Sequence, residues 1–443
     1  MFEISPGWLS FLMFTGLLVG LFLGLPLAFV LGGVAFYFGL LGWGWGSFAL
    51  FINRMDATLN DYILVSIPLF IFMAQLLGKS GVAEGVFRAV RYLFGPVRGG
   101  VAISVIIVST LLAACTGITG AACVTMGLLA LPIMVEYKYD HRMATGSITG
   151  SSALGILIPP SIMLIVMAEQ SGETVGRLFA GAILPGLLLS SLFIIYVLYQ
   201  SWRHPEKGPS LTVDERAQVS RGQLAIMTLK SLVPPVILIV GVLGSIFAGV
   251  ATPTEAAGVG AFISFLMVIA YGRFDLREFY ETLLVTAKTS SMVLIIIIGA
   301  TCFTGVFLGL HGGDFVRELI LSAPGGKWVQ FGIMMLICFF LGMFLDWIAI
   351  VMITFPIFLP IADHLGFDKL WFVVVVAVML QDSFITPPFG YNLFYLKGIA
   401  PKEVSTKDIY LGAVPFWELM EVGLVLCVIF PGLITWLPSV LVK

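Results

Sequence analysis

The most constraining feature of this sequence is a run of 37 residues, 99–135, that contains no charged side chain. A single helix of that length would be about 55 Å long, at 1.5 Å per residue, whereas the hydrocarbon core of a bilayer is about 30 Å thick. The chain must therefore turn back within this run, and its middle, TGITGA at 116–121, is rich in turn-forming residues. A second apolar run, 331–362, contains one charge, Asp346, at its centre. We expect each run to form either a re-entrant helical hairpin or two spans joined by a tight turn.

The composition of the chain requires a lipid environment. Hydrophobic residues make up 59% of the 443 residues, charged residues make up 11%, and the mean hydropathy is +1.06, whereas soluble domains contain about 25% charged residues. The other apolar segments are about 17–25 residues long and alternate with short polar loops, which predicts an all-α polytopic protein in a lipid bilayer and not a membrane barrel. The net charge of −2, without a basic tract, argues against a nucleic acid partner.

The residues that usually bind metals or carry redox chemistry do not form a pattern. The five cysteines and four histidines are scattered without the paired spacing of a metal site. We therefore expect no cofactor and no transition-metal site.

The remaining apolar segments indicate further membrane spans. The segment 79–98 is cationic and amphipathic, as is typical of a helix that lies on a membrane surface. The polar segment 204–230 is expected to be a loop, and its Lys and Arg residues place it in the cytoplasm by the positive-inside rule. Two spans are expected within 8–53, and others near 62–78, 141–170, 178–202, 231–250, 255–271, 288–309, 370–396 and 409–437.

The two halves of the chain are related by a shift of 228 residues. LPI at 131–133 corresponds to LPI at 359–361, and the proline pair at 159–160 corresponds to the pair at 387–388. The ordered matches indicate a duplication. An odd number of expected spans separates the two halves, so the repeats should be inverted relative to each other, as in many secondary transporters.

These features divide the chain into five parts. The repeats should each contain one hairpin, at about 99–137 and 331–366, and one broken helix, at about 141–170 and 370–396. The parts are N-terminal scaffold spans (1–61), a first inverted repeat (62–203), a cytoplasmic loop (204–230), linking scaffold spans (231–287) and a second inverted repeat (288–443).

The proline pairs identify where the two broken helices are interrupted, in GILIPPS at 155–161 and ITPPFG at 385–390. Proline removes a backbone donor and clashes with the preceding turn, so neither helix can continue through its pair. The freed carbonyl groups attract a cation and the freed N–H groups attract an anion, because neither can stay unpaired in hydrocarbon. The flanking segments GSITGSS (146–152) and MLQDSFITPPFGYN (379–392) supply hydroxyl, amide and carboxylate oxygens. These oxygens suit a hard cation of the size of Na⁺.

Several long segments resemble the large membrane subunit of tripartite ATP-independent periplasmic (TRAP) transporters. They include ATPTEAAGVGAF (251–262), LGMFLDWIAIVMITFPIFLPIA (341–362) and SFITPPFGYNLFYLKGIAP (383–401), and a fourth covers 150–189. The resemblance implies an elevator-type symporter that imports a small organic acid with Na⁺ across a bacterial or archaeal cytoplasmic membrane. It also implies two partners, a periplasmic substrate-binding protein and a separate small membrane subunit of about four spans.

The resemblance also implies site residues, at the hairpin tips (116–120 and 345–347) and at the two breaks. It departs from the family at TGITGAA, where many members have a serine-rich turn, and at Asp382, where an uncharged polar residue is expected. The implied Na⁺ site residues are Thr116, Gly117, Thr119, Gly150, Ser151, Ser152, Pro159, Leu345, Asp346, Gln381, Asp382, Thr386, Pro387 and Gly390. The implied substrate contacts are Thr119, Gly120, Ser161, Trp347, Tyr391 and Asn392.

Two other functions are compatible with parts of the pattern. A Na⁺/carboxylate symporter that works without a binding protein would need the same breaks and hairpins. An intramembrane aspartyl enzyme would use Asp346 and Asp382 as two carboxyl groups that share a proton at close range. No motif enforces that contact, so we expect a transporter and not an enzyme.

Overall fold

The computed structural model describes residues 5–117, 119–217 and 219–442, which form helices and the short connections between them. Over this part of the chain no strand forms. Eight of its helices are long and apolar enough to cross a membrane, or nine if the bent pair α4 (Ser66–Lys79) and α5 (Val82–Phe94) counts as one span. The expectation of an all-α polytopic membrane protein is confirmed.

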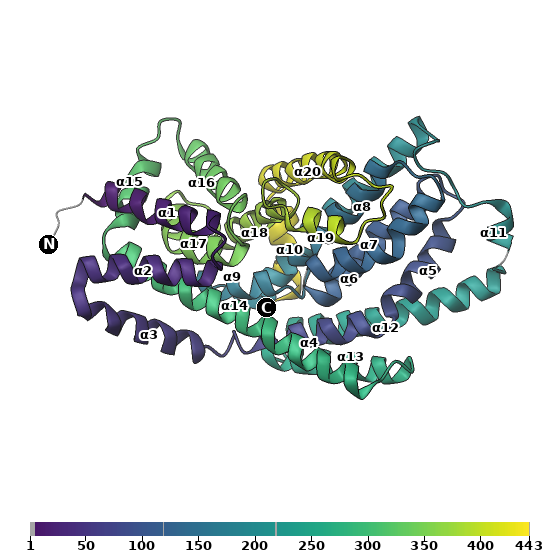
Figure 1. Cartoon of the computed structure of the whole chain (residues 1–443), viewed down its shortest axis with the longest axis horizontal. Helices are drawn as coiled ribbons and strands as arrows, with labels where there is room; N and C mark the ends of the chain where they lie inside the picture. The colour runs from purple at the N-terminus through teal and green to yellow at the C-terminus, as the bar shows by residue number, and fades with distance from the viewer. Residues whose placement is uncertain (1–4, 118, 218, 443) are drawn as a thin grey trace.

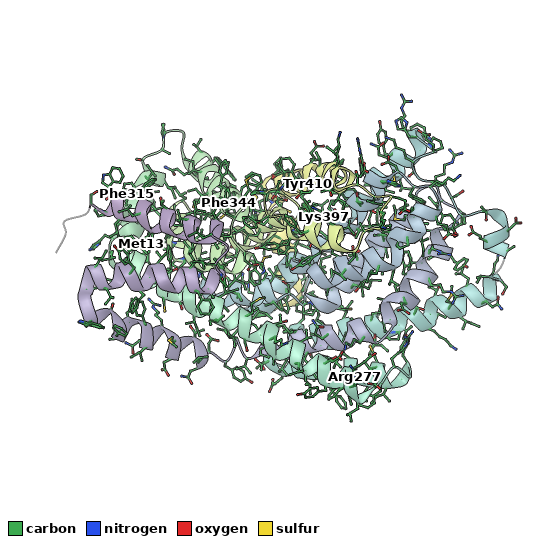
Figure 2. All side chains as sticks on the ribbon, viewed as in Figure 1. Met13, Arg277, Phe315, Phe344, Lys397 and Tyr410 are labelled. Atoms are coloured by element: carbon green, nitrogen blue, oxygen red, sulfur yellow. The ribbon has the colours of Figure 1, made fainter. Side chains whose placement is uncertain are left out.

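Long helices form one layer of the molecule, along the lower side of Figure 1. Within it α14 packs against α2, α3 and α4, and α13 packs against α4 and α12. Arg277 near the start of α14 and Phe315 just beyond its end are labelled in Figure 2 and show how far this helix extends. The layer contains α2 (Leu27–Trp43), α3 (Ser47–Leu59), α4, α12 (Arg221–Phe247), α13 (Pro253–Ala270) and α14 (Leu276–Gly309).

The N-terminal segment forms three helices instead of two spans alone. The two spans expected within 8–53 correspond to α1 (Pro6–Phe22) and α2, and the Gly/Trp-rich segment after α2 forms a 3₁₀ turn that leads into α3. Large apolar side chains on these helices point outward, including Trp8 and Phe22, which are 65% and 69% exposed. Such side chains are stable against lipid and not against water.

Two sets of helices, which begin with α4 and α14 of this layer, follow the same order along the chain. The first set is α4, α5, α6 (Gly100–Thr116), α7 (Thr119–Glu136), α8 (His141–Ala153), α9 (Ile162–Ser171) and α10 (Val175–Arg203). The second set is α14, α15 (Gly312–Leu321), α16 (Lys327–Gly342), α17 (Trp347–His364), α18 (Lys369–Leu380), α19 (Tyr391–Ile399) and α20 (Thr406–Ile429), followed by α21 (Gly432–Leu441).

The shift of 228 residues superposes these two sets. It carries Thr119–Glu136 onto Trp347–His364 from the first residue to the last, and it carries the two broken helices onto each other within a few residues. Between α4 and α14 the chain passes through the interrupted helix α8–α9, α10, α12 and α13, while the hairpin returns to its starting side. Counting α4, five such segments precede α14, an odd number, and the inverted orientation of the repeats stays a prediction that depends on each of them crossing the bilayer.

Both hairpins and both broken helices form as expected. The hairpins are α6–α7 and α16–α17, and the members of each pair pack against each other. The helix α8 is followed by a 3₁₀ turn (Leu154–Ile156) and then by α9, and α18 is followed by a 3₁₀ turn (Gln381–Phe384) and then by α19. Every residue of α18 after Lys369 is buried, and α8 is buried from Met143 onward, so the two interrupted helices form the core of the molecule.

Three boundaries differ from the sequence expectations. The polar segment 204–230 is not a loop throughout, because a capping box between Ser220 and Gln223 starts α12 at Arg221; within the loop, Val213–Ala217 form the short helix α11. The expected span 409–437 is divided into α20 and α21, because Pro431 lacks the N–H that would continue α20. The expected span 288–309 begins earlier, at Leu276, because Asp275 accepts hydrogen bonds from the N–H groups of Arg277 and Glu278.

The amphipathic segment 79–98 contains the helix α5, but its apolar face is covered by protein. The helix bends by 58° from α4, and its buried residues face α6 and α12. The same amphipathic pattern that predicts a membrane surface helix therefore serves packing against two other helices here.

Candidate ion and substrate site

The first break lies in the protein core. The hydroxyl of Ser161 donates a hydrogen bond to the carbonyl of Ile156 and accepts one from the N–H of Leu164 at 3.4 Å, so it spans the gap between the end of α8 and the start of α9. Pro159 is buried at this gap. The Ser161 side chain is thus used to cap α9.

The tip of the first hairpin packs directly against this break. Gly117 ends α6 with φ = +61°, and a Cβ added to it would lie 2.8 Å from the carbonyl oxygen of Pro160. Only glycine fits both the backbone conformation and the space. Thr116 is the last residue of α6, and its side chain, like residue Ile118, lies outside the described part of the structure.

The second hairpin meets the second break in the equivalent way. A Cβ added to Gly342, at the end of α16, would overlap Oγ of Ser383 in the break. Leu345 is buried in the tip, and Asp346 caps α17 by accepting a hydrogen bond from the N–H of Ile348 at 3.0 Å. Each hairpin tip is therefore held against the broken helix of its own repeat.

Both tips also line one cavity, of about 150 Å³. Its walls contain the first residues of α7 and α17, Thr119 and Trp347, so two helix N-termini meet there. The opposite wall is formed by α4 and α14 of the long-helix layer. The full lining is Ile71, Gly117, Thr119, Gly120, Ile156, Ile162, Thr289, Met292, Val293, Ile296, Asp346, Trp347, Ile348, Phe384 and Tyr395.

Three buried side-chain oxygens beside the breaks have no hydrogen-bond donor among the described residues: Oε1 of Gln381, Oδ1 of Asp382 and Oδ1 of Asn392. These residues are 0%, 2% and 0% exposed. Their amide nitrogens are engaged, since Gln381 donates to the carbonyl of Val378 at 3.3 Å and Asn392 donates to the carbonyl of Thr149 at 3.0 Å. A buried acceptor without a donor costs about 1–3 kcal/mol, and a bound cation removes that cost.

The hydroxyl groups near the breaks present oxygen lone pairs in the same way. Ser151, Ser152 and Thr386 each donate their hydroxyl hydrogen to the backbone carbonyl four residues earlier. A hydroxyl oxygen that donates its hydrogen in this way still has lone pairs that can coordinate a cation. These residues are buried, so they can contribute oxygens to a cation site without competition from bulk water.

Other predicted Na⁺ site residues have a mainly structural setting. A Cβ at Gly150 would lie 2.7 Å from Phe416, so this glycine allows α8 to pack closely against α20. Gly390 precedes α19 and donates its N–H to the carbonyl of Thr386 at 2.9 Å. Pro387 is exposed, in contrast to Pro159 in the first break.

The predicted substrate residues separate into two groups. Thr119, Gly120 and Trp347 line the cavity. Ser161, Tyr391 and Asn392 do not: Ser161 caps α9, the Tyr391 ring packs on the ring of Phe384 at 5.9 Å, and Asn392 bonds to α8.

Sequence reasoning missed residues that come from outside the motifs. Tyr395 lines the cavity and packs on the first tip, where a Cβ at Gly120 would lie 2.9 Å from its ring. Its position one turn after Tyr391 on α19 was the signal that could have revealed it. Thr289 and Met292 of α14 also line the cavity, and Glu421 of α20 lies against Asp382. None of these three carries a motif.

Duplicated hairpins, interrupted helices with unpaired oxygens and one cavity shared with a separate helix layer define a membrane transport protein of the secondary transporter class. A model of the family described as "Tripartite ATP-independent periplasmic transporter, DctM component" matches residues 14–433. The chain belongs to this family, and it is a multi-pass component of an inner-membrane transporter and not an enzyme.

Known proteins are similar to the chain over nearly its full length. The "C4-dicarboxylate TRAP transporter large permease protein DctM" of Rhodobacter capsulatus is 30% identical, over 98% of this chain and 100% of that protein. The "Sialic acid TRAP transporter large permease protein SiaM" of Vibrio cholerae is 27% identical, over 98% of this chain and 97% of that protein. The crystal structure of the Alcanivorax borkumensis YdaH transporter aligns with a TM-score of 0.60 at 14% identity, over 96% of this chain and 98% of that one, which shows a shared fold.

Proposed function

We propose that this TRAP large permease subunit imports a small organic acid together with Na⁺, by movement of its hairpin domain against the long-helix layer. The observation that most directly supports this proposal is the cavity in which both hairpin tips face α4 and α14. The hairpin domain comprises the two hairpins, the two broken helices, α10 and α20.

The electrostatics of this cavity suit an anion. The N-termini of α7 and α17 both open into it, and a helix N-terminus carries a partial positive charge and free N–H groups. Its volume of about 150 Å³ has room for several water molecules. A small carboxylate fits this space. Carboxylates are also named for the relatives that transport C4-dicarboxylates and sialic acid.

The unpaired oxygens at the breaks suit the coupling cation. Gln381, Asp382 and Asn392 present buried acceptors next to the segments that hold the tips. A Na⁺ ion bound there would fix each break and, through the packing of Gly117 on Pro160 and Gly342 on Ser383, would fix the tips that contact the substrate. Ion binding would in this way organise substrate binding.

The proposal includes two partners. The family is tripartite and its relatives are named large permeases, which supports a separate small membrane subunit and a periplasmic binding protein that delivers the acid. The stand-alone alternative gains no support from the family assignment. The aspartyl enzyme is also not favoured, because Asp346 caps α17 in the cavity whereas the carboxyl group next to Asp382 is that of Glu421.

The test is uptake into liposomes that contain this chain and its small subunit, with the binding protein and its acid outside. We expect uptake to depend on an inward Na⁺ gradient and to be lost when the binding protein is omitted. Uptake of equal rate without the Na⁺ gradient would reject the coupling, and uptake without the binding protein would favour the stand-alone symporter.

A further inference from the structure

The carboxyl group of Asp382 lies deep in the hairpin domain. The residue is 2% exposed, and its Oδ1 has no hydrogen-bond donor among the described residues. Its backbone carbonyl is occupied, since it accepts from the N–H and the hydroxyl of Thr386 at 2.9 and 2.7 Å. The side-chain carboxyl group of Asp382, and not its backbone, therefore lacks a hydrogen-bond donor.

The nearest charged group is a second carboxyl. The carboxyl group of Glu421 on α20 interacts with the carboxyl group of Asp382. It is half-buried, and it is the one charged residue that lines an otherwise apolar groove of about 440 Å³ between α16 and α20. The other lining residues are Phe331, Gly332, Met335, Leu336, Phe339, Met379, Trp417, Leu424, Val425 and Val428.

No positive charge in the described chain balances this pair. Neither Asp382 nor Glu421 takes part in any of the ion pairs found among the described residues. Glu418, the other acid on this part of α20, is exposed and on the side of Tyr196. Two carboxylates in contact and away from water repel each other strongly, so the arrangement is stable only with a cation between them or with a shared proton.

The oxygens present favour a hard cation. The pair supplies carboxylate oxygens from two different helices, and Oε1 of Gln381, the residue before Asp382, is a further buried acceptor without a donor. Oxygen ligands of this kind bind Na⁺, Mg²⁺ or Ca²⁺, but the divalent ions require about six or more oxygens or retained waters. The two carboxylates and the one amide oxygen do not reach that number, which favours the monovalent ion.

We propose that Glu421 completes a Na⁺ site with Asp382, so that α20 holds the second broken helix through a bound ion. The inference rests on Na⁺ coupling as the proposed function and assigns part of it to a residue outside the interrupted helices. The bound ion would join α20 to the 3₁₀ turn between α18 and α19. The second break would then be ordered only when Na⁺ is present.

The experiment compares three forms of the complete transporter in liposomes, with the binding protein and its acid at saturating concentration. The initial uptake rate is measured against external Na⁺ for the unchanged chain, for Glu421→Gln and for Glu418→Gln. We expect Glu421→Gln to raise the half-saturating Na⁺ concentration by about tenfold or more, because a charged ligand is replaced by a neutral one. The rate at saturating Na⁺ should change much less. Glu418→Gln, an exposed control on the same helix, should leave both quantities unchanged.

Each result decides the proposal. An unchanged half-saturating Na⁺ concentration for uptake by Glu421→Gln would overturn it. If the same variant altered only the pH dependence of uptake, the proposal would also be overturned, and the two carboxyl groups would share a proton instead. If the unchanged chain shows no Na⁺ dependence at all, the proposed coupling itself fails, and the two failures are thereby distinguished. Should Glu421→Gln not fold, Glu421→Asp keeps the charge on a shorter side chain. It is expected to raise half-saturating Na⁺ in the same direction, and an unchanged value would again overturn the proposal.

Discussion

Gly117 is the residue on which the contact between the first hairpin and the first break depends. Substitution by alanine would place a left-handed backbone conformation on a non-glycine residue, at a cost of about 1–2 kcal/mol. It would also force a methyl group against the Pro160 carbonyl, at a further cost of about 1–3 kcal/mol. We expect Gly117→Ala to lower the thermal stability of the purified protein and to lower uptake to near background, because the tip can no longer close on the break.

Gly172 provides a matched control for this prediction. Its φ of +66° is close to that of Gly117, but no atom lies within 4 Å of an added Cβ. Gly172→Ala should therefore incur the backbone cost alone and retain uptake. Equal losses of uptake in both variants would show that the backbone conformation, and not the contact between tip and break, is responsible.

Single residues also show what the sequence can and cannot predict. The proline pairs and the glycines of the first tip identify the breaks and the turn, because these residue types act on the backbone wherever they occur. Glu421 carries no such local signal, and Tyr395 carries only its position one turn after Tyr391. Their roles depend on which face of α20 and α19 is turned toward the break or the tip, and packing between helices decides that.

At the scale of elements, the connection between the repeats is tied to the base of the first hairpin. Backbone hydrogen bonds join Gly99 to Gly208 at 2.8 Å and Leu211 to Gly95 at 2.9 Å. Further along, the hydroxyl of Tyr137, just after α7, donates a hydrogen bond to the carboxylate of Glu215 in α11. This hydrogen bond lowers the pKa of Glu215, while burial, followed by the same bond, raises the pKa of Tyr137 to about 12.

Removal of this tie should loosen the connection without affecting the hairpins. We expect Tyr137→Phe to increase the rate of trypsin cleavage between residues 204 and 220 by roughly two- to fivefold, the range for an exposed charged contact. Glu206→Gln, which alters an exposed contact with His204, should have no such effect.

The hydrogen bond between Tyr137 and Glu215 should also depend on pH. Because the pKa of Glu215 in the folded protein lies below its unfolded value of about 4.3, this bond stabilises the fold above that pH, and the stabilisation is lost as the pH falls through the folded pKa. Protection from an acid-active protease should follow the same course, and Tyr137→Phe should weaken that pH dependence, since the hydrogen bonds from Thr212 to Glu215 remain.

Most helices were predictable from the sequence because corresponding helices and connections of the two repeats have similar lengths. The shift of 228 residues follows from two short motifs and matches α7 to α17 over their whole lengths. The errors concern helix ends: α12 and α14 begin in polar segments, where capping residues and tertiary packing extend a helix that hydropathy does not detect. Hydropathy measures only the lipid-facing part of such helices.

At the scale of the whole molecule, the proposed movement takes place at the contact between the hairpin domain and the long-helix layer. The hydroxyl of Thr304 on α14 donates a hydrogen bond at 2.9 Å to the carbonyl of Met352 on α17. Within the layer, the hydroxyl of Thr254 on α13 donates to the carbonyl of Tyr62 at 3.1 Å. The elevator movement that we propose would break the first contact and leave the second intact.

Disulfides placed at these two contacts distinguish a moving hairpin domain from a fixed one. The five native cysteines are buried, so the double variant Thr304→Cys/Met352→Cys can be oxidised in a background of protected thiols. We expect this cross-link to stop uptake into liposomes and a reductant to restore it, because the hairpin domain would be held to α14. The cross-link Tyr62→Cys/Thr254→Cys should leave uptake unchanged, since it joins parts that move together. Full uptake by a completely cross-linked Thr304→Cys/Met352→Cys protein would mean that the acid crosses the membrane without displacement of α17 along α14, and the elevator movement would have to be abandoned.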